Sequence, residues 1–121
     1  MTMSCTITEE RMSHIKKVKF AWVSGSDGKA SGTTINPYSG EIIRLVTIPG
    51  ATTTAPTDNY DVVVNDGDAT DVLMGAGADR DSAATEQVLG SLLGCVANDT
   101  LSLSIENAGD SKAGTVILYI K

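Results

Sequence analysis

Three aspartates crowd one short stretch of this chain and are its best candidates for binding chemistry. Asp66, Asp68 and Asp71 lie within residues 65–71 (NDGDATD). Carboxylates on a tight loop are the ligands that hard cations such as Ca²⁺ prefer. The glycine and the distal glutamate of a twelve-residue Ca²⁺ loop are not in place, however, and Asp-Gly is a common hairpin signal. We therefore expect a turn with solvated carboxylates, and neither a metal nor a cofactor.

The residues that usually perform catalysis are few and have no motif around them. His14 is the only histidine and has no neighbouring partner that would make it a base, so we expect a surface or packing role. Cys5 and Cys95 form at most one bridge, which is no disulfide framework, and we expect free thiols. Cys95 lies in an apolar run and should be a small buried side chain. The sequence predicts a protein that is not an enzyme.

Strand patterns dominate the chain. Apolar residues alternate with polar or mixed ones over residues 17–22, 60–64, 101–105 and 115–120, and residues 41–48 are apolar on both faces. Such period-two patterns are typical of β-strands. Turn signals separate them, and we expect hairpins joining 60–64 to 71–74 and 101–105 to 116–120. The predicted core consists of Val18, Phe20, Trp22, Ile43, Leu45, Tyr60, Val62, Val64, Leu101, Leu103, Ile105, Val116 and Leu118.

The number and spacing of these segments indicate an all-β fold. We expect a single-domain β-sandwich or jelly roll of about seven to eight short antiparallel strands. Residues 85–96 are ambiguous, but Gly90 and Gly94 would each weaken a helix by about 1 kcal/mol, which favours a strand or irregular structure. The polar residues 1–16 are interpreted as an N-terminal arm, and residues 17–121 as the β-sandwich domain. Residues 75–77 (GAG) lack the pattern of a phosphate site and are expected to be a flexible loop.

Charge and hydropathy exclude several classes of protein. The net charge of −6 argues against binding to nucleic acid, which needs clustered Lys and Arg to neutralise phosphates. The basic residues Arg11, Lys16, Lys17 and Lys19 are interpreted as a solvated strand face. The sequence contains no run of about eighteen apolar residues, which a membrane-spanning helix would need. Its N-terminus also lacks the apolar core of a secretory signal. We expect synthesis and folding in a cytoplasm.

Four segments resemble a family of small structural proteins of tailed phages. They are residues 36–44 (NPYSGEIIR), 55–62 (APTDNYDV), 71–73 (DVL) and 103–109 (LSIENAG). The resemblance implies a virion component, a capsid cement or decoration protein on the capsid surface, assembled in the host cytoplasm. Its implied partner is the major capsid protein of a phage head, and it implies a homo-oligomer, either a dimer or a trimer. No functional residue carries over, because these motifs are strands and turns.

Two weakly patterned polar segments are candidates for protein contacts: the arm over residues 1–16 and the loop over residues 75–84. Frayed surface is the alternative interpretation of both. The candidate contact residues in and beside them are Met3, Ile7, Met12, Ile15, Met74, Asp79 and Arg80. Two other functions remain open at this stage, namely a phage tail, baseplate or fibre component and a carbohydrate- or ligand-binding β module. The last would need a concave face that brings Trp22 together with a tyrosine.

Overall fold

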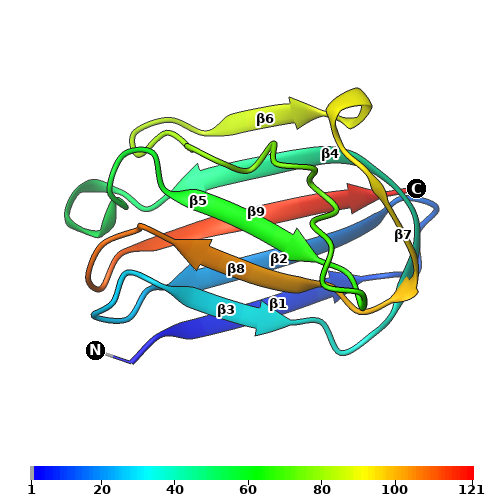
Figure 1. The fold of residues 1–121 in the computed structure, drawn as a ribbon, viewed down its shortest axis with the longest axis horizontal. Helices are drawn as coiled ribbons and strands as arrows, with labels where there is room; N and C mark the ends of the chain where they lie inside the picture. The colour runs from blue at the N-terminus through cyan, green and yellow to red at the C-terminus, as the bar shows by residue number, and fades with distance from the viewer. Residues whose placement is uncertain (1) are drawn as a thin grey trace.

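The computed structural model describes residues 2–121, and within them every strand pairing is antiparallel (Figure 1). The strands are β1 (Ser4–Glu10), β2 (Lys16–Val23), β3 (Ala30–Thr33), β4 (Tyr38–Pro49), β5 (Asp61–Asn65), β6 (Glu86–Leu89), β7 (Cys95–Asp99), β8 (Ser102–Glu106) and β9 (Ala113–Ile120). Two single helical turns, η1 (Thr52–Thr54) and η2 (Gly90–Leu92), join them, and neither is long or apolar enough to cross a membrane. The all-β prediction is confirmed, with nine strands in place of the expected seven or eight.

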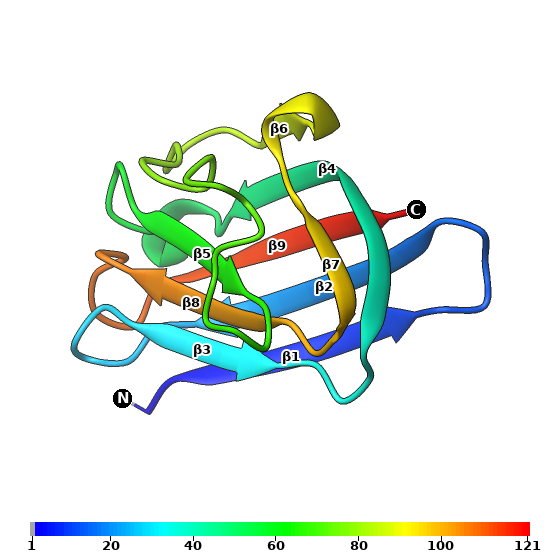
Figure 2. The ribbon, with the colours of Figure 1, turned by 45° about the vertical axis from the view of Figure 1, so that its right-hand side comes forward.

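Two curled sheets face each other across the core, as Figures 1 and 2 show. The larger sheet has the order β1-β2-β9-β4-β6, with β7 also paired to β4, and the smaller has the order β3-β8-β5. β4 curves strongly, so its first residues pair with β7 and its later residues with β9 and β6 (Figure 2). The predicted β-sandwich is therefore the observed architecture.

The core contains all the alternate residues that the sequence pattern selected, with one exception. Every residue of the predicted core is buried except Ile43, which is only partly buried, and Ile42 takes its place inside. The register of β4 against β9 shifts between Ile42 and Arg44. Such a bulge places two residues opposite one and reverses which side chain points inward. The bulge therefore explains the error at Ile43.

The structure places half of the predicted N-terminal arm, residues 4–10 and Lys16, in strands of the larger sheet. β1 pairs with β2 along all seven of its residues, and the side chains of Cys5 and Ile7 pack against the core. Residues 4–10 (SCTITEE) alternate between exposed and partly buried positions, as a strand requires, but Cys5 and Ile7 are the only apolar members of the inward set. The predicted boundary after residue 16 thus falls within β2, whose partner β1 belongs to the same sheet, so it does not separate an arm from a domain.

The predicted C-terminal hairpin is wrong, because its two strands lie in different sheets. β8 pairs with β3 and β5, whereas β9 pairs with β2 and β4. The connection between them crosses from one sheet to the other, and Ser24 fixes it. The Ser24 hydroxyl donates to the carbonyl of Gly109 (2.6 Å) and accepts from the N–H of Lys112 (2.8 Å). The alternation of apolar and polar residues predicted the two strands correctly. It is equally compatible with a hairpin in one sheet and with two strands in different sheets.

The segment after β5 also differs from the predicted hairpin. Its antiparallel pairing is limited to isolated bridges, between Asn65 and Asp71 and between Tyr60 and Arg80. The chain nevertheless runs back along β5, since Val62 N–H donates to the Gly77 carbonyl (2.8 Å) and Arg80 N–H to the Tyr60 carbonyl (2.8 Å). Residues 71–80 therefore cover the outer edge of the smaller sheet, which would otherwise expose unpaired backbone groups. Farther on, β6, η2 and β7 confirm that residues 85–96 form no α-helix.

Candidate functional site

Four exposed apolar residues lie in three connections, the β1–β2 loop, the β3–β4 turn and η2, at the end of the sandwich where the C-terminus lies; Figure 1 shows these connections. Met12 and Ile15 lie in the β1–β2 loop, and Met12 is fully exposed. Ile35 in the β3–β4 turn is 89% exposed, and Leu92 in η2 is 61% exposed. We call these four residues the apolar end. The sequence pattern predicted Met12 and Ile15 as contact residues but not the other two.

A single carboxylate holds two of these loops together. Glu9, at the end of β1, accepts hydrogen bonds from the backbone N–H groups of Ile35 (3.0 Å) and Asn36 (3.3 Å). It also accepts from the side-chain amide of Asn36 (3.2 Å) and from the hydroxyl of Tyr38 (2.6 Å). The guanidinium of Arg11 lies 5.7 Å from the centre of the Tyr38 ring, within the range of a cation–π contact. The β1–β2 loop and the β3–β4 turn therefore have fixed relative positions.

The hydrogen bonds to Glu9 stabilise the ionised form of its carboxyl group. Burial of this carboxyl raises its pKa, but the hydrogen bonds from Tyr38, Ile35 and Asn36 outweigh that effect, and the pKa lies below the ordinary value of 4.5. Burial, followed by the bond to Glu9, raises the pKa of the Tyr38 hydroxyl. Tyr38 thus remains a neutral donor at physiological pH, and Glu9 an ionised acceptor.

We expect Glu9→Gln to lower the free energy of unfolding at neutral pH by about 1 kcal/mol, because charge-assisted hydrogen bonds become weaker ones. The folded state depresses the pKa of Glu9, so its contribution is present above 4.5 and is lost as the pH falls through the folded value. Urea denaturation at a series of pH values measures this. Glu10→Gln is the matched control, since Glu10 lies opposite Lys17. Equal pH dependence of stability in both variants would contradict this role for Glu9.

The remaining predicted contact residues are spread over other parts of the surface. Met3 is exposed near the β2–β3 connection, whereas Ile7 packs partly under the sheet edge. Met74 is 70% exposed and Asp79 is also exposed, both in the segment along β5. Arg80 is partly buried and pairs with Glu86 at 3.5 Å. The structure therefore does not unite the predicted contact residues in one surface.

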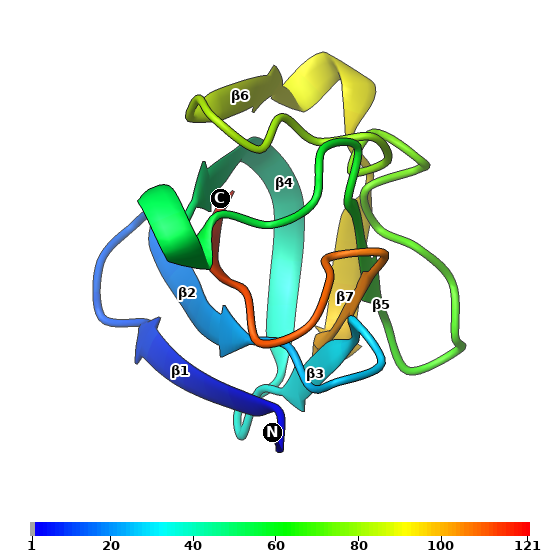
Figure 3. The ribbon, with the colours of Figure 1, turned by 90° about the vertical axis from the view of Figure 1, so that its left-hand side faces the viewer.

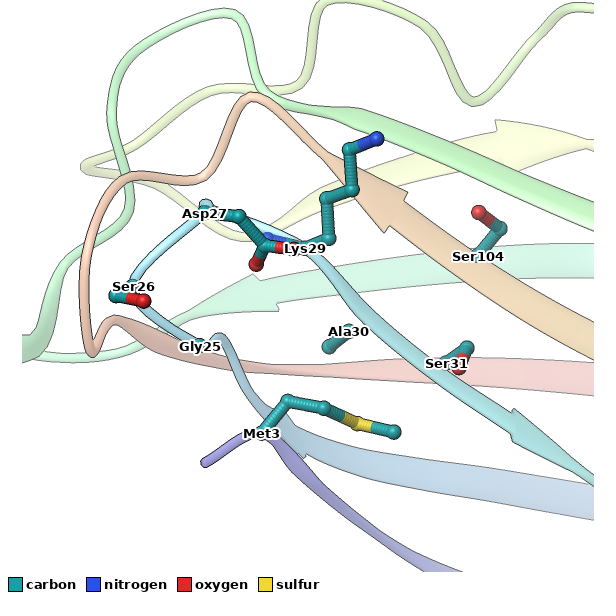
Figure 4. A pocket seen from close by; sticks show the side chains of 8 residues that line it. All are labelled: Met3, Gly25, Ser26, Asp27, Lys29, Ala30, Ser31 and Ser104. Atoms are coloured by element: carbon teal, nitrogen blue, oxygen red, sulfur yellow. The ribbon is translucent and has the colours of Figure 1, made fainter. Parts of the chain in front are cut away.

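A shallow pocket of about 490 Å³ lies beside Met3, as Figure 4 shows. Its lining is mostly small, and its charged members are Asp27 and Lys29. Asp27 accepts the backbone N–H of Lys29 (3.1 Å), and the Lys29 ammonium lies 3.7 Å from Glu106. Both charges therefore serve local turn and strand contacts.

The three candidate aspartates do not act as one group. The Asp66 carboxylate accepts from the N–H groups of Asp68 (2.9 Å) and Thr70 (3.1 Å), which closes the expected turn. Asp71 points elsewhere and accepts the backbone N–H groups of Val64 (3.2 Å), Leu73 (3.0 Å) and Gly75 (2.9 Å). Asp99, at the end of β7, lies near Asp66 and Asp68 instead of Asp71. One carboxylate oxygen from each of Asp66, Asp68 and Asp99 lies within 4.8 Å of the others.

The histidine and the cysteines are not positioned together by any described contact. His14 lies exposed in the β1–β2 loop. Both cysteines are free, as predicted, and burial raises the pKa of the Cys5 thiol. The prediction that Cys95 is buried is wrong: the alternation of β7 points Val96 into the core and Cys95 outward.

Comparison with known proteins assigns no family to this chain. No protein-family model matches it, and no curated protein is significantly similar to it in sequence. The function therefore has to be argued from the residues and their arrangement.

Proposed function

We propose that this chain is a virion structural protein, a cement or decoration protein that binds and stabilises the head of a tailed phage. Its partner is the major capsid protein, and its place is the capsid surface after assembly in the host cytoplasm. The resemblance of the four segments to small tailed-phage structural proteins supports this proposal. A rigid β-sandwich that presents loops at one end is suited to contact with neighbouring capsid subunits, because a sandwich holds its end loops in fixed positions.

The apolar end is the observation that carries the proposal. Single exposed apolar residues are ordinary, but several large ones on neighbouring loops indicate a protein contact. Here the β1–β2 loop and the β3–β4 turn expose Met12, Ile15 and Ile35, and the four hydrogen bonds to Glu9 hold these two connections next to each other. Because little ordering is then needed on binding, more of the contact energy is available for affinity.

The carbohydrate-binding alternative lacks the feature that would favour it. Its sugar platform required an exposed Trp22 near a tyrosine. Trp22 is 1% exposed, and its ring meets that of Tyr60 inside the core, with 5.7 Å between ring centres. Both rings therefore stabilise the domain instead of facing a ligand.

Binding to undecorated heads of the corresponding phage tests the proposal. We expect wild-type protein to co-sediment with heads to a saturating stoichiometry, and the double variant Met12→Asp/Ile35→Asp to bind at least about tenfold more weakly. Each side chain would lose an apolar contact worth about 1.5–3 kcal/mol, and 1.4 kcal/mol is tenfold in affinity. Met3→Asp is the matched control, because Met3 is an exposed apolar residue outside the apolar end.

Two results would contradict the proposal. If wild-type protein bound isolated tails but not heads, the chain would be a tail or baseplate component. If the double variant bound heads as tightly as wild type, the apolar end would not be the contact surface.

A further inference from the structure

The charge of this protein is concentrated in one segment. Residues 58–81 contain seven aspartates and one arginine, a formal balance of −6, which equals the net charge of the whole chain. The rest of the chain is balanced. We call this segment the acidic edge, because its second half runs back along the outer edge of β5. Its aspartates are Asp58, Asp61, Asp66, Asp68, Asp71, Asp79 and Asp81.

The acidic edge also carries an exposed apolar side chain. Met74, 70% exposed, lies between Asp71 and Asp79 in sequence. The positive charge of Arg80 is offset locally by Glu86 at 3.5 Å. The surface that the segment offers is therefore negative, with an apolar residue within it.

The outer face of the larger sheet has the opposite character. Strand register places Lys17 opposite Tyr119, and Tyr119 opposite Arg44, while Lys19 follows on the same face of β2. Their sequence neighbours Val18, Leu118 and Leu45 point into the core, so these four side chains point outward. The Tyr119 ring lies 4.9 Å from the Arg44 guanidinium and 6.0 Å from the Lys17 ammonium. We call Lys17, Lys19, Arg44 and Tyr119 the basic platform.

An exposed apolar residue accompanies this platform too. Leu89 of β6 lies opposite Arg44 and is 73% exposed. Val46 and Ile117, in the next row of the same face, are nearly covered by their neighbours. The platform is thus cationic, with an aromatic ring and an apolar margin, on a chain whose net charge is negative.

The basic platform and the acidic edge lie on opposite sides of the molecule. Figure 3 shows β1 and β2 of the larger sheet on the left, and β5 with the segment that follows it on the right. One copy can therefore present its acidic edge while its own platform remains free. Complementary potentials of this kind fix the orientation of two proteins and raise their association rate.

We propose that the platform binds the acidic edge of a second copy of this chain, so that copies associate head to tail. The three cations face the aspartates of the neighbour, and Met74 of one copy meets the margin around Leu89 of the next. Such an interface is heterologous: it uses two different surfaces and either closes as a ring, for example a trimer, or continues as a chain of copies. It differs from the apolar end, so it stands apart from the proposed head binding.

The first test is the mass of the purified protein in solution. We expect the weight-average mass, measured by sedimentation, to rise with concentration and to fall as salt increases from about 0.01 M to about 1 M. Over that range the screening length falls from about 30 Å to about 3 Å, and contacts between exposed charges weaken accordingly. A protein that stayed monomeric at low salt and high concentration would overturn the proposal.

The decisive test uses two variants that each lack one surface. Lys19→Glu/Arg44→Glu reverses the platform, and Asp68→Lys/Met74→Lys reverses the acidic edge. We expect each variant alone to associate at least about tenfold more weakly than wild type, because like charges then face each other. Mixed together, they should associate again, because each variant retains the native surface that the other lacks and the two reversed surfaces carry opposite charges.

Controls separate this result from changes in net charge or folding. Lys29→Glu and Asp110→Lys reverse charges outside both surfaces and should associate as wild type does. Circular dichroism checks folding, and the milder pair Lys19→Gln/Arg44→Gln and Asp68→Asn/Met74→Gln replaces any variant that unfolds. A symmetric dimer that both double variants still form, or a mixture without complex, would overturn the proposal.

Discussion

Trp22→Ala is expected to lower the free energy of unfolding by about 4 kcal/mol, because truncating a buried aromatic residue loses its transfer energy and leaves a cavity. Trp22 packs against Tyr60 within the core. The neighbouring strand β9 leaves room for this ring, since a Cβ at Gly114, the register partner of Trp22, would lie 2.6 Å from it. A domain of this kind has about 5–15 kcal/mol of stability in total, so the loss would be a large part of it. Guanidinium denaturation measures the change.

Trp22→Phe is the matched variant for this prediction. It keeps a buried ring and should cost clearly less than the alanine variant. If Trp22→Ala changed the stability by less than about 1 kcal/mol, the described core packing would be incorrect at its largest residue.

Gly77→Ala is expected to cost about 3 kcal/mol, because a side chain there meets backbone that cannot easily move. A Cβ at this position would lie 2.1 Å from the carbonyl oxygen of Val62 and 3.0 Å from Leu73. The Gly77 carbonyl itself accepts the Val62 N–H at 2.8 Å. Relief of the clash would therefore move the covering segment away from β5. Denaturation, together with faster hydrogen exchange at Val62, would show this.

Gly75→Ala separates the effect of space from that of backbone conformation. Nothing lies within 4 Å of a Cβ at Gly75, although its φ is +84°. Only the left-handed conformation is then penalised, by about 1 kcal/mol. Equal losses in the two variants would mean that contact with Val62 does not determine the requirement for glycine at residue 77.

The role of Gly77 could not be predicted from the sequence. The GAG segment was expected to be a flexible loop, because glycine permits many conformations. The structure requires glycine at residue 77 for the opposite reason, a close and fixed approach to β5. A glycine can provide either conformational freedom or a close approach of two backbone segments. Which of the two applies at residue 77 depends on Val62, which is distant in sequence.

The strands themselves could be predicted, because alternation is local. Val18, Phe20 and Trp22 were assigned to the core from their spacing alone and are buried. Sheet membership could not be predicted in the same way. The residues of β8 and β9 alternate between apolar and polar as in the two strands of a hairpin, yet the two strands lie in different sheets. Long-range packing makes that choice, and no local pattern records it.

The candidate site was predictable only in part for the same reason. Met12 and Ile15 stood out as apolar residues in a polar segment. Ile35 had no such signal in the sequence; it is exposed in the β3–β4 turn, where its N–H donates to Glu9. Glu9 carries no local signal for that role, because its partners are 26 or more residues away in sequence.

The most direct test of the proposed function is the heat resistance of phage heads with and without this protein. We expect bound wild-type protein to raise the temperature at which undecorated heads break, since a ligand that prefers the intact shell must stabilise it. The increase should saturate at the same protein-to-subunit ratio as binding does. Heads that bind no protein, or that bind it without any change in their disruption temperature, would contradict a cement role.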